Sequence, residues 1–185
     1  MEPYVRKDAS FALCGLNCCL CPRFHTDGSS RCPGCGGQDF ISMHPTCPVI
    51  TCGKKHDSVE YCFECREYPC KRYSTIGTAD SFISYRNVIH NFAEANKDLK
   101  QYLKDLKQKN KILLDLISNH NDGRSKGFFC LAVDLLPLSE LTTILKEIKA
   151  CWKAVDMDPK EKGKKTREIF ELHARKLKIE LSLRN

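Results

Sequence analysis

The apolar residues of this chain follow two different patterns, and the change comes near residue 73. Before that point they stand singly among Gly, Pro, Cys and short polar stretches, which is typical of turns and tight loops. After it they recur at intervals of three and four, the spacing of amphipathic helices. We therefore expect two parts, a cysteine-rich head at residues 1–73 and a helical domain, the tail, at residues 74–185.

The spacing in the tail predicts about four to five helices. The first should begin with Thr78 or Asp80 as its N-cap and continue past Phe92. The second should span about 98–118, where the turn residues 119–123 end it. The remaining segments are a short buried one at 127–133, a helix at 138–155, a helix begun by the capping sequence at 158–161, and an alternating, extended end at 179–183.

The head has too few apolar residues to fold by burial alone. Bound metal would supply the missing stability, because a structural zinc ion contributes roughly 10–16 kcal/mol in small peptides. No low-complexity linker separates the head from the tail, so we expect the two to pack together. The expected fold class is α-rich and metal-stabilised, with an irregular cysteine-knuckle zinc head packed on the helical tail.

Ten of the 13 cysteines stand in four groups with the spacing of metal ligands. A C-x-x-C turn places two sulfurs on one side of a tight loop, and two such pairs make a tetrahedral thiolate site. The predicted ligands are Cys14, Cys18 and Cys21; Cys32 and Cys35; Cys47 and Cys52; and Cys62, Cys65 and Cys70.

Three cysteines fall outside these groups. Cys19, next to Cys18, is expected either as a partly buried thiol or as a reactive or auxiliary ligand. Cys130 and Cys151 lie among apolar residues and are expected to be core residues.

The sequence also indicates the compartment. No signal peptide is recognisable at the start, and no apolar stretch approaches the roughly 18 residues that a membrane span needs. We therefore expect a cytoplasmic protein, in which a dense cysteine pattern indicates metal or redox chemistry rather than disulfides.

Zinc, at two or three ions per chain, is the metal that the pattern favours, and an iron–sulfur cluster is the alternative. The glycines after Cys35 let amides turn back toward a sulfur, as in a zinc knuckle. The triplet C-x3-C-x2-C beginning at Cys14 matches that of radical S-adenosylmethionine enzymes, but the strand–helix barrel of those enzymes is not expected here. A third site could recruit His25, His44 or His56.

Spacing alone does not divide the ten sulfurs among sites. One arrangement pairs Cys32/Cys35 with Cys47/Cys52 and joins the first triplet to the last. A crossed arrangement joins Cys32/Cys35 with Cys62/Cys65. The two triplets could also hold a binuclear cluster with bridging sulfurs.

The formal net charge of +7 is ordinary once metal is counted. Each four-cysteine zinc site adds two negative charges, so two sites would bring the charge to about +3. Lysines concentrate at 104–111 and 160–165, but acidic residues interrupt the second run and aromatic residues are not interleaved with either. Nucleic-acid binding is therefore only the third functional hypothesis.

The cysteine motifs resemble those of a known family. The opening CGLNCCLCP and the closing CFECREYPC match an uncharacterised family of small, cysteine-rich prokaryotic proteins, in which zinc binding is expected. The tail is similar to longer members through residues 121–125, 128–133 and 135–137. The resemblance implies metal ligands at the ten positions and brings no reaction with it.

The expected function is that of a zinc-binding, metal-stabilised module that binds a protein or a small ligand, with the cleft between head and tail as its contact site. The alternative is an iron–sulfur or thiol-based redox protein. Phosphate-loop, H-E-x-x-H and G-x-S-x-G motifs do not occur in the sequence, and no catalytic residue is predicted.

Overall fold

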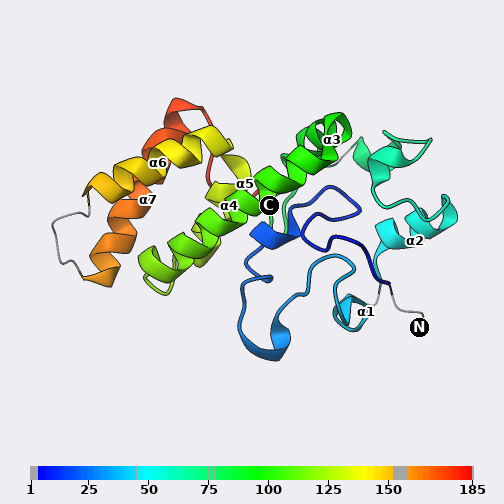
Figure 1. Ribbon diagram of the computed structural model, residues 1–185, viewed down its shortest axis with the longest axis horizontal. Helices are drawn as coiled ribbons and strands as arrows, with labels where there is room; N and C mark the ends of the chain where they lie inside the picture. Colours follow the sequence, from blue (N-terminus) through cyan, green and yellow to red (C-terminus); the bar gives the residue numbers. More distant parts are fainter. Residues whose placement is uncertain (1–3, 45, 75, 77, 152–157, 185) are drawn as a thin grey trace.

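Helices account for all the regular secondary structure in the part of the chain that the computed structural model describes, residues 4–44, 46–74, 76, 78–151 and 158–184. This part contains seven α-helices and four short 3-10 helices (Figure 1). The expected α-rich fold, with an irregular head and a helical tail, is confirmed. In the same residues, no helix is both long enough and apolar enough to cross a membrane.

The head consists of loops punctuated by very short helices. They are η1 (Cys18–Leu20), η2 (Gly28–Ser30), α1 (Phe40–Met43), α2 (Pro48–Lys55), η3 (Cys62–Glu64) and η4 (Lys71–Tyr73). Pro48 stands at the first position of α2, where the missing N–H costs nothing. Cysteines begin or flank η1, α2, η3 and η4, so these short turns set the directions of the sulfurs.

Five helices build the tail. They are α3 (Val88–Lys97), α4 (Leu99–His120), α5 (Lys126–Leu135), α6 (Leu138–Cys151) and α7 (Pro159–Lys176). The long α4 contacts each of the other four, and η1 of the head contacts α4 and α5 (Figure 1). Asp98 caps α4 by accepting from the amide of Gln101 at 2.9 Å, and Asp158 caps α7 by accepting from the amide of Lys160 at 3.0 Å. The helices expected at these two starts are confirmed.

The first tail helix begins later than the sequence predicts, at Val88 instead of near Asp80. The Asp80 carboxylate does not cap a helix; it accepts from the amide of Tyr85 at 2.8 Å and from the Arg184 guanidinium at 3.1 Å. The chain therefore loops around Asp80 before α3 starts. Phe82 lies in this loop with 61% of its surface exposed, although its apolar spacing had placed it on a helix face.

The C-terminal end returns to the same loop. The Asp80 amide donates to the Arg184 carbonyl at 2.9 Å, and the Arg86 guanidinium donates to the carbonyls of Glu180 and Ser182 at 2.6 and 2.5 Å. The described residues of this end form no strand ladder. Residues 179–183, whose apolar and polar residues alternate, therefore belong to an irregular segment that hydrogen bonds from Asp80 and Arg86 hold in place.

Head and tail share one hydrophobic core, as the lack of a linker led us to expect. At its centre Phe92 of α3 meets rings from the head, with centroid distances of 5.9 Å to Phe11, 5.3 Å to Phe63, 5.4 Å to Tyr68 and 5.8 Å to Tyr73. Burying an aromatic ring among four others is worth several kcal/mol, so this cluster fixes the two parts against each other.

The two tail cysteines differ in burial. Cys130 lies in α5 with 2% of its surface exposed, as predicted for a core residue. Cys151 is exposed at the last position of α6, so its prediction as a core residue is wrong. The apolar spacing of its helix ends one turn earlier, at the buried Ile148.

Candidate functional site

All ten predicted ligands lie in the head as free thiols. Cys35 is buried and the other nine are half-buried, and the described residues contain no disulfide. The structure distributes their side chains over two neighbourhoods and a remaining pair.

The first neighbourhood, site 1, consists of Cys14, Cys18, Cys35 and Cys47. Burial raises the pKa of the Cys14 thiol, and the nearby Cys35 and Cys47 thiols raise it further. Burial also raises the pKa of the Cys18 thiol, with Cys35 and Cys14 again adding to the shift. These effects show that the four sulfurs are electrostatic neighbours, and Cys62 and Cys32 also act on Cys14 and Cys18 respectively. A cation bound among them would favour the thiolate forms.

Backbone amides point at these sulfurs. Hydrogen bonds from the backbone of Leu16, Cys35 and Leu13 act on the sulfurs of Cys14, Cys18 and Cys35 respectively, and each lowers the pKa of its thiol against the effect of burial. Amide donors of this kind stabilise a thiolate and orient it. The turns of the head are therefore shaped for ligating sulfurs.

The second neighbourhood, site 2, surrounds a small cavity of about 30 Å³. The cysteines that line it are Cys52, Cys62, Cys65 and Cys70, and His56 also reaches it. A cavity of this size holds about one water-sized object. Burial raises the pKa of Cys62 to about 11, while a hydrogen bond with the Tyr73 hydroxyl opposes the shift.

Helix α2 explains why Cys47 and Cys52 belong to different sites. Cys47 is the N-cap of α2 and Cys52 lies inside the helix, five residues further on. Five residues turn a helix by about 140° beyond a full circle, so the two side chains leave on different sides. We therefore assign Cys47 and Cys52 to different sites, which none of the arrangements considered from the spacing does.

Cys21 and Cys32 are assigned to neither site, although Cys32 also acts on Cys18 of site 1. The Cys32 thiol raises the pKa of Cys21, behind the larger effect of burial, so the two lie near each other. The Cys32 sulfur is also 3.9 Å from Nε2 of His44. Cys19 is buried, with its carbonyl 2.6 Å from Nε2 of His25, and its predicted role as a partly buried thiol fits this position.

The sulfurs in each site are neighbours and do not form a closed coordination shell. Within the described ranges, no three or more His, Cys, Asp or Glu side chains are arranged as a ligand set for a metal. The donor chemistry nevertheless fits a metal of the zinc class, since each site gathers four thiols and amides stabilise the thiolates of site 1.

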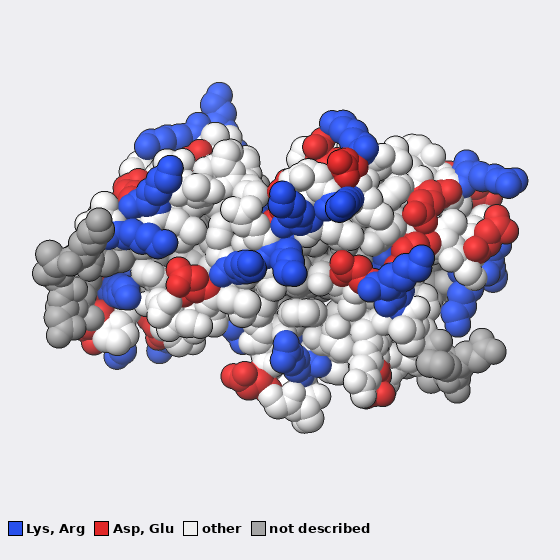
Figure 2. All heavy atoms as spheres, in the orientation of Figure 1, with Lys and Arg blue, Asp and Glu red and all other residues white. Residues whose placement is uncertain are grey.

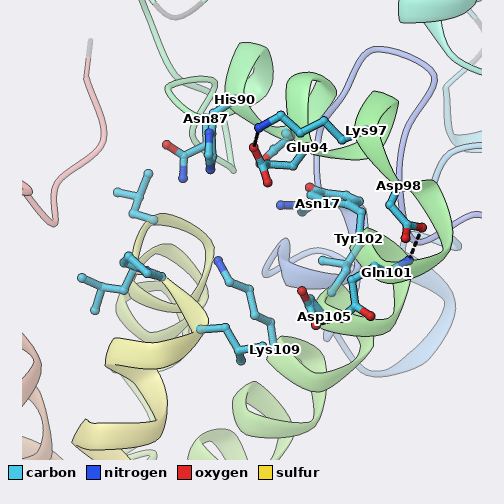
Figure 3. Close-up of a pocket in the computed structure, with 16 residues that line it drawn as sticks. Asn17, Asn87, His90, Glu94, Lys97, Asp98, Gln101, Tyr102, Asp105 and Lys109 are labelled. Atoms are coloured by element: carbon cyan, nitrogen blue, oxygen red, sulfur yellow. Dashed lines mark hydrogen bonds and ion pairs between the residues drawn. The ribbon is translucent and has the colours of Figure 1, made fainter.

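A larger cleft, of about 380 Å³, lies where the tail meets the head (Figure 3). Its walls come from α3, α4 and the turn between α5 and α6, and the head contributes Asn17 from the loop before η1. We expected a contact site between head and tail, whereas the tail supplies every residue that lines this cleft except Asn17.

Asn17 links the cleft to a buried carboxylate. Its amide donates to Asp134 Oδ1 at 3.0 Å, and its carbonyl oxygen accepts from the Tyr102 hydroxyl at 2.8 Å. Burial raises the pKa of Asp134 to about 6, while Lys109 opposes the shift. A head residue thus satisfies a polar group that the tail would otherwise bury unpaired.

Lys109 extends from α4 into the cleft, toward the side on which Asn87 lies (Figure 3). Its ammonium donates to the Asp134 carbonyl at 3.1 Å, and the Asn87 side chain donates to the same oxygen at 3.2 Å. Burial lowers the pKa of Lys109, and the Asp134 carboxylate opposes this effect.

Sequence reasoning missed the residues of this cleft. Asp134, the buried carboxylate beside the cleft, could have been recognised in the sequence, because it is a charged residue directly after the apolar run 127–133. Asn17 stands inside the first cysteine motif and could have been singled out there. Lys109 belongs to the lysine run at 104–111, which we considered only in relation to nucleic-acid binding.

Positive and negative side chains are mixed over the face of the molecule shown in Figure 2. The lysine run of α7 contributes Lys160 and Lys164 to an open hollow that Glu168 and Glu171 also line. The charge pattern on this helix is therefore interrupted in space as well as in sequence.

Comparison with known proteins gives one match. Residues 10–75 match a family model described as "Protein of unknown function (DUF3795)". This range covers all ten predicted ligands and almost the whole head, so the resemblance to an uncharacterised family is confirmed for that part of the chain. Comparisons with curated proteins and with solved structures found no match.

Proposed function

We propose that this protein is a metal-stabilised binding module. Its head holds two zinc ions, one at site 1 (Cys14, Cys18, Cys35, Cys47) and one at site 2 (Cys52, Cys62, Cys65, Cys70), and its cleft binds a ligand. The observation that carries the proposal is the cavity of about 30 Å³ lined by four cysteines, which has the size and the donors for a single ion.

The metal has a structural role in this proposal. Zinc sites made of four cysteines are usually closed, whereas catalytic zinc keeps an open position and commonly uses His or carboxylate ligands. Thiolate ligation in the cytoplasm, where cysteines stay reduced, fits the free thiols of the head. Cys21, Cys32 and His44 are the residues to which we assign a third, weaker site.

The first experiment measures metal per chain by plasma mass spectrometry, with an optical spectrum, on protein purified anaerobically without added metal. We expect two zinc ions, or three if the third site fills, and no visible absorbance. Iron with acid-labile sulfide would contradict the zinc proposal and support the redox alternative.

Paired variants test the division of the sulfurs. Cys47→Ser and Cys52→Ser should each lose one zinc ion, and the double variant should lose both, because the two residues serve different sites. Cys52→Ser combined with Cys62→Ser should lose only one ion, since both belong to site 2. Cys151→Ser, at an exposed cysteine, is the control and should keep the full content. A Cys47/Cys52 double variant that loses a single ion would place both residues in one site.

A further inference from the structure

The Lys109 ammonium is a partly buried charge with no carboxylate in direct contact, although the Asp134 and Asp105 carboxylates attract it from farther away. Its one hydrogen bond in the structure goes to a neutral acceptor, the Asp134 carbonyl. No carboxylate of the described residues lies within 4.0 Å of its Nζ. Since an ammonium has three N–H donors, two of those at Lys109 stay available for another acceptor.

The surroundings of Lys109 in the cleft also favour a negative charge. Asn87, whose amide converges with Lys109 on one oxygen, is the N-cap of α3 and makes no capping hydrogen bond with its own side chain. The first turn of this ten-residue helix lines the cleft through His90. A helix N-terminus carries a partial positive charge. In this first turn the Val88 amide already donates to the Tyr85 carbonyl at 3.2 Å, so the charge of the helix end is its contribution to the cleft.

The acidic residues of the cleft already have partners. Glu94 pairs with Lys97 at 2.6 Å, and Asp105 accepts from the Gln101 side chain at 2.8 Å. Asp98 caps α4, and Figure 3 shows it with Gln101 and Asp105 on the side away from Asn87. Asp105 and the buried Asp134 still attract Lys109, but no carboxylate of the described residues is in ion-pair contact with its ammonium.

From this geometry we propose that the cleft binds a small organic anion, whose carboxylate or phosphate group accepts from Lys109 and lies at the N-terminus of α3. The volume of about 380 Å³ is that of a site for a small molecule rather than for a single ion. The proposal deepens the binding function given above and rests on it.

Calorimetric titration with two probes, inorganic phosphate and succinate, tests the proposal on protein whose zinc content has been measured. We expect saturable binding. The Lys109→Met variant should bind the preferred probe about tenfold more weakly or worse, because it loses a charge-assisted hydrogen bond. Lys107→Met removes an equal charge from an exposed position on the same helix and should bind like the wild type. Comparison of the probes tells a phosphate site from a carboxylate site.

Chemical labelling gives a readout that does not depend on the folding of a variant. In the wild type, either probe should slow acetylation of Lys109 by acetic anhydride, measured by mass spectrometry, and leave Lys107 unaffected. Equal protection of both lysines, equal affinities of the two variants, or no saturable binding of either probe would overturn the proposal. Full zinc content in the same sample would show that the anion site has failed while the metal module stands.

Discussion

At the scale of single residues, Gly15 in the first cysteine motif shows why the head depends on local geometry. Its φ of +90° lies in the region that glycine favours, and a Cβ built there would come within 2.9 Å of the Phe92 ring. The chain thus approaches the central ring of the shared core with its bare backbone. The Asn91 side chain fixes this approach by donating to the Gly15 carbonyl at 3.0 Å.

Gly15→Ala should therefore lower the free energy of unfolding by about 2–4 kcal/mol, through backbone strain and displacement of Phe92. Urea unfolding followed by circular dichroism measures this. Gly123→Ala is the matched control, because Gly123 has a φ of +87° and nothing within 4 Å of the added Cβ. The control should lose only about 1–2 kcal/mol from strain. Equal losses in the two variants would show that contact with Phe92 has no cost.

The Tyr73 hydroxyl supports the cysteine sites from outside. It forms a hydrogen bond with the Cys62 sulfur and lies 3.5 Å from the Cys14 carbonyl oxygen, so it touches a residue of each site. Partners of this kind orient a ligand, and their loss commonly weakens metal binding about 10–100-fold.

We expect Tyr73→Phe to lose zinc to a competing chelator at about one-tenth of the chelator concentration that the wild type requires. Tyr68→Phe is the control, since Tyr68 packs on the Tyr73 ring at 5.1 Å and also lines the cavity of site 2, yet in the described residues its hydroxyl makes no hydrogen bond with a sulfur. If both variants hold zinc like the wild type, the Tyr73 hydroxyl has no part in binding.

At this scale the sequence identified the ten thiols but not their environment. Spacing reveals the candidate ligands, because a tight turn needs particular residues at particular positions. It does not reveal that Asn17 meets Asp134, which is 117 residues away. Contacts of that kind depend on how the helices pack, and no local pattern encodes them.

At the scale of elements, a histidine clamp joins the last two helices. The His173 ring on α7 lies between two glutamates of α6, with Nδ1 at 2.5 Å from Glu140 and Nε2 at 2.8 Å from Glu147. Burial opposes the charged ring, but the two hydrogen bonds outweigh it and raise the pKa of His173. The imidazolium form therefore stabilises the contact between α6 and α7.

A raised pKa gives stability that is present at low pH and is lost as the pH rises through the folded-state value. The difference in unfolding free energy between wild type and His173→Gln should thus shrink from pH 6 to pH 9. His120 is the control of opposite sign. Burial lowers its pKa, so the stability that its neutral ring contributes is lost as the pH falls and the ring becomes protonated. Chemical unfolding from pH 5 to pH 9 measures both, and a constant difference for His173→Gln would contradict the clamp.

The elements themselves were predictable where their ends carry local signals. Asp98 and Asp158 cap the helices that the sequence assigned to them. Asp80 had the same local signal, but a distant partner, Arg184, holds its carboxylate and the helix starts later. A capping residue marks a helix start only when no tertiary partner takes its side chain.

At the scale of the whole molecule, the shared aromatic core makes head and tail one cooperative unit. Phe92 belongs to a tail helix, yet four of its ring neighbours come from the head. Loss of metal from the head would loosen these rings and weaken the tail as well.

Removal of zinc with a strong chelator should therefore lower the melting temperature of the tail helices, seen as a single transition at 222 nm by circular dichroism. Added zinc should restore it. Two separate transitions, or a helical signal that melts as before, would show that the tail folds independently of the head. Calorimetry on the same samples provides the check on two-state behaviour.

If the head binds two metal ions as we propose, helix α2 has a consequence for the order in which they bind. It is eight residues long, too short to persist alone, and it presents Cys47 to one site and Cys52 to the other. The first ion to bind would order the helix and so position a ligand for the second ion, and we therefore expect positively cooperative binding. Native mass spectrometry at substoichiometric zinc should then find empty and doubly loaded chains together, with the singly loaded species scarce.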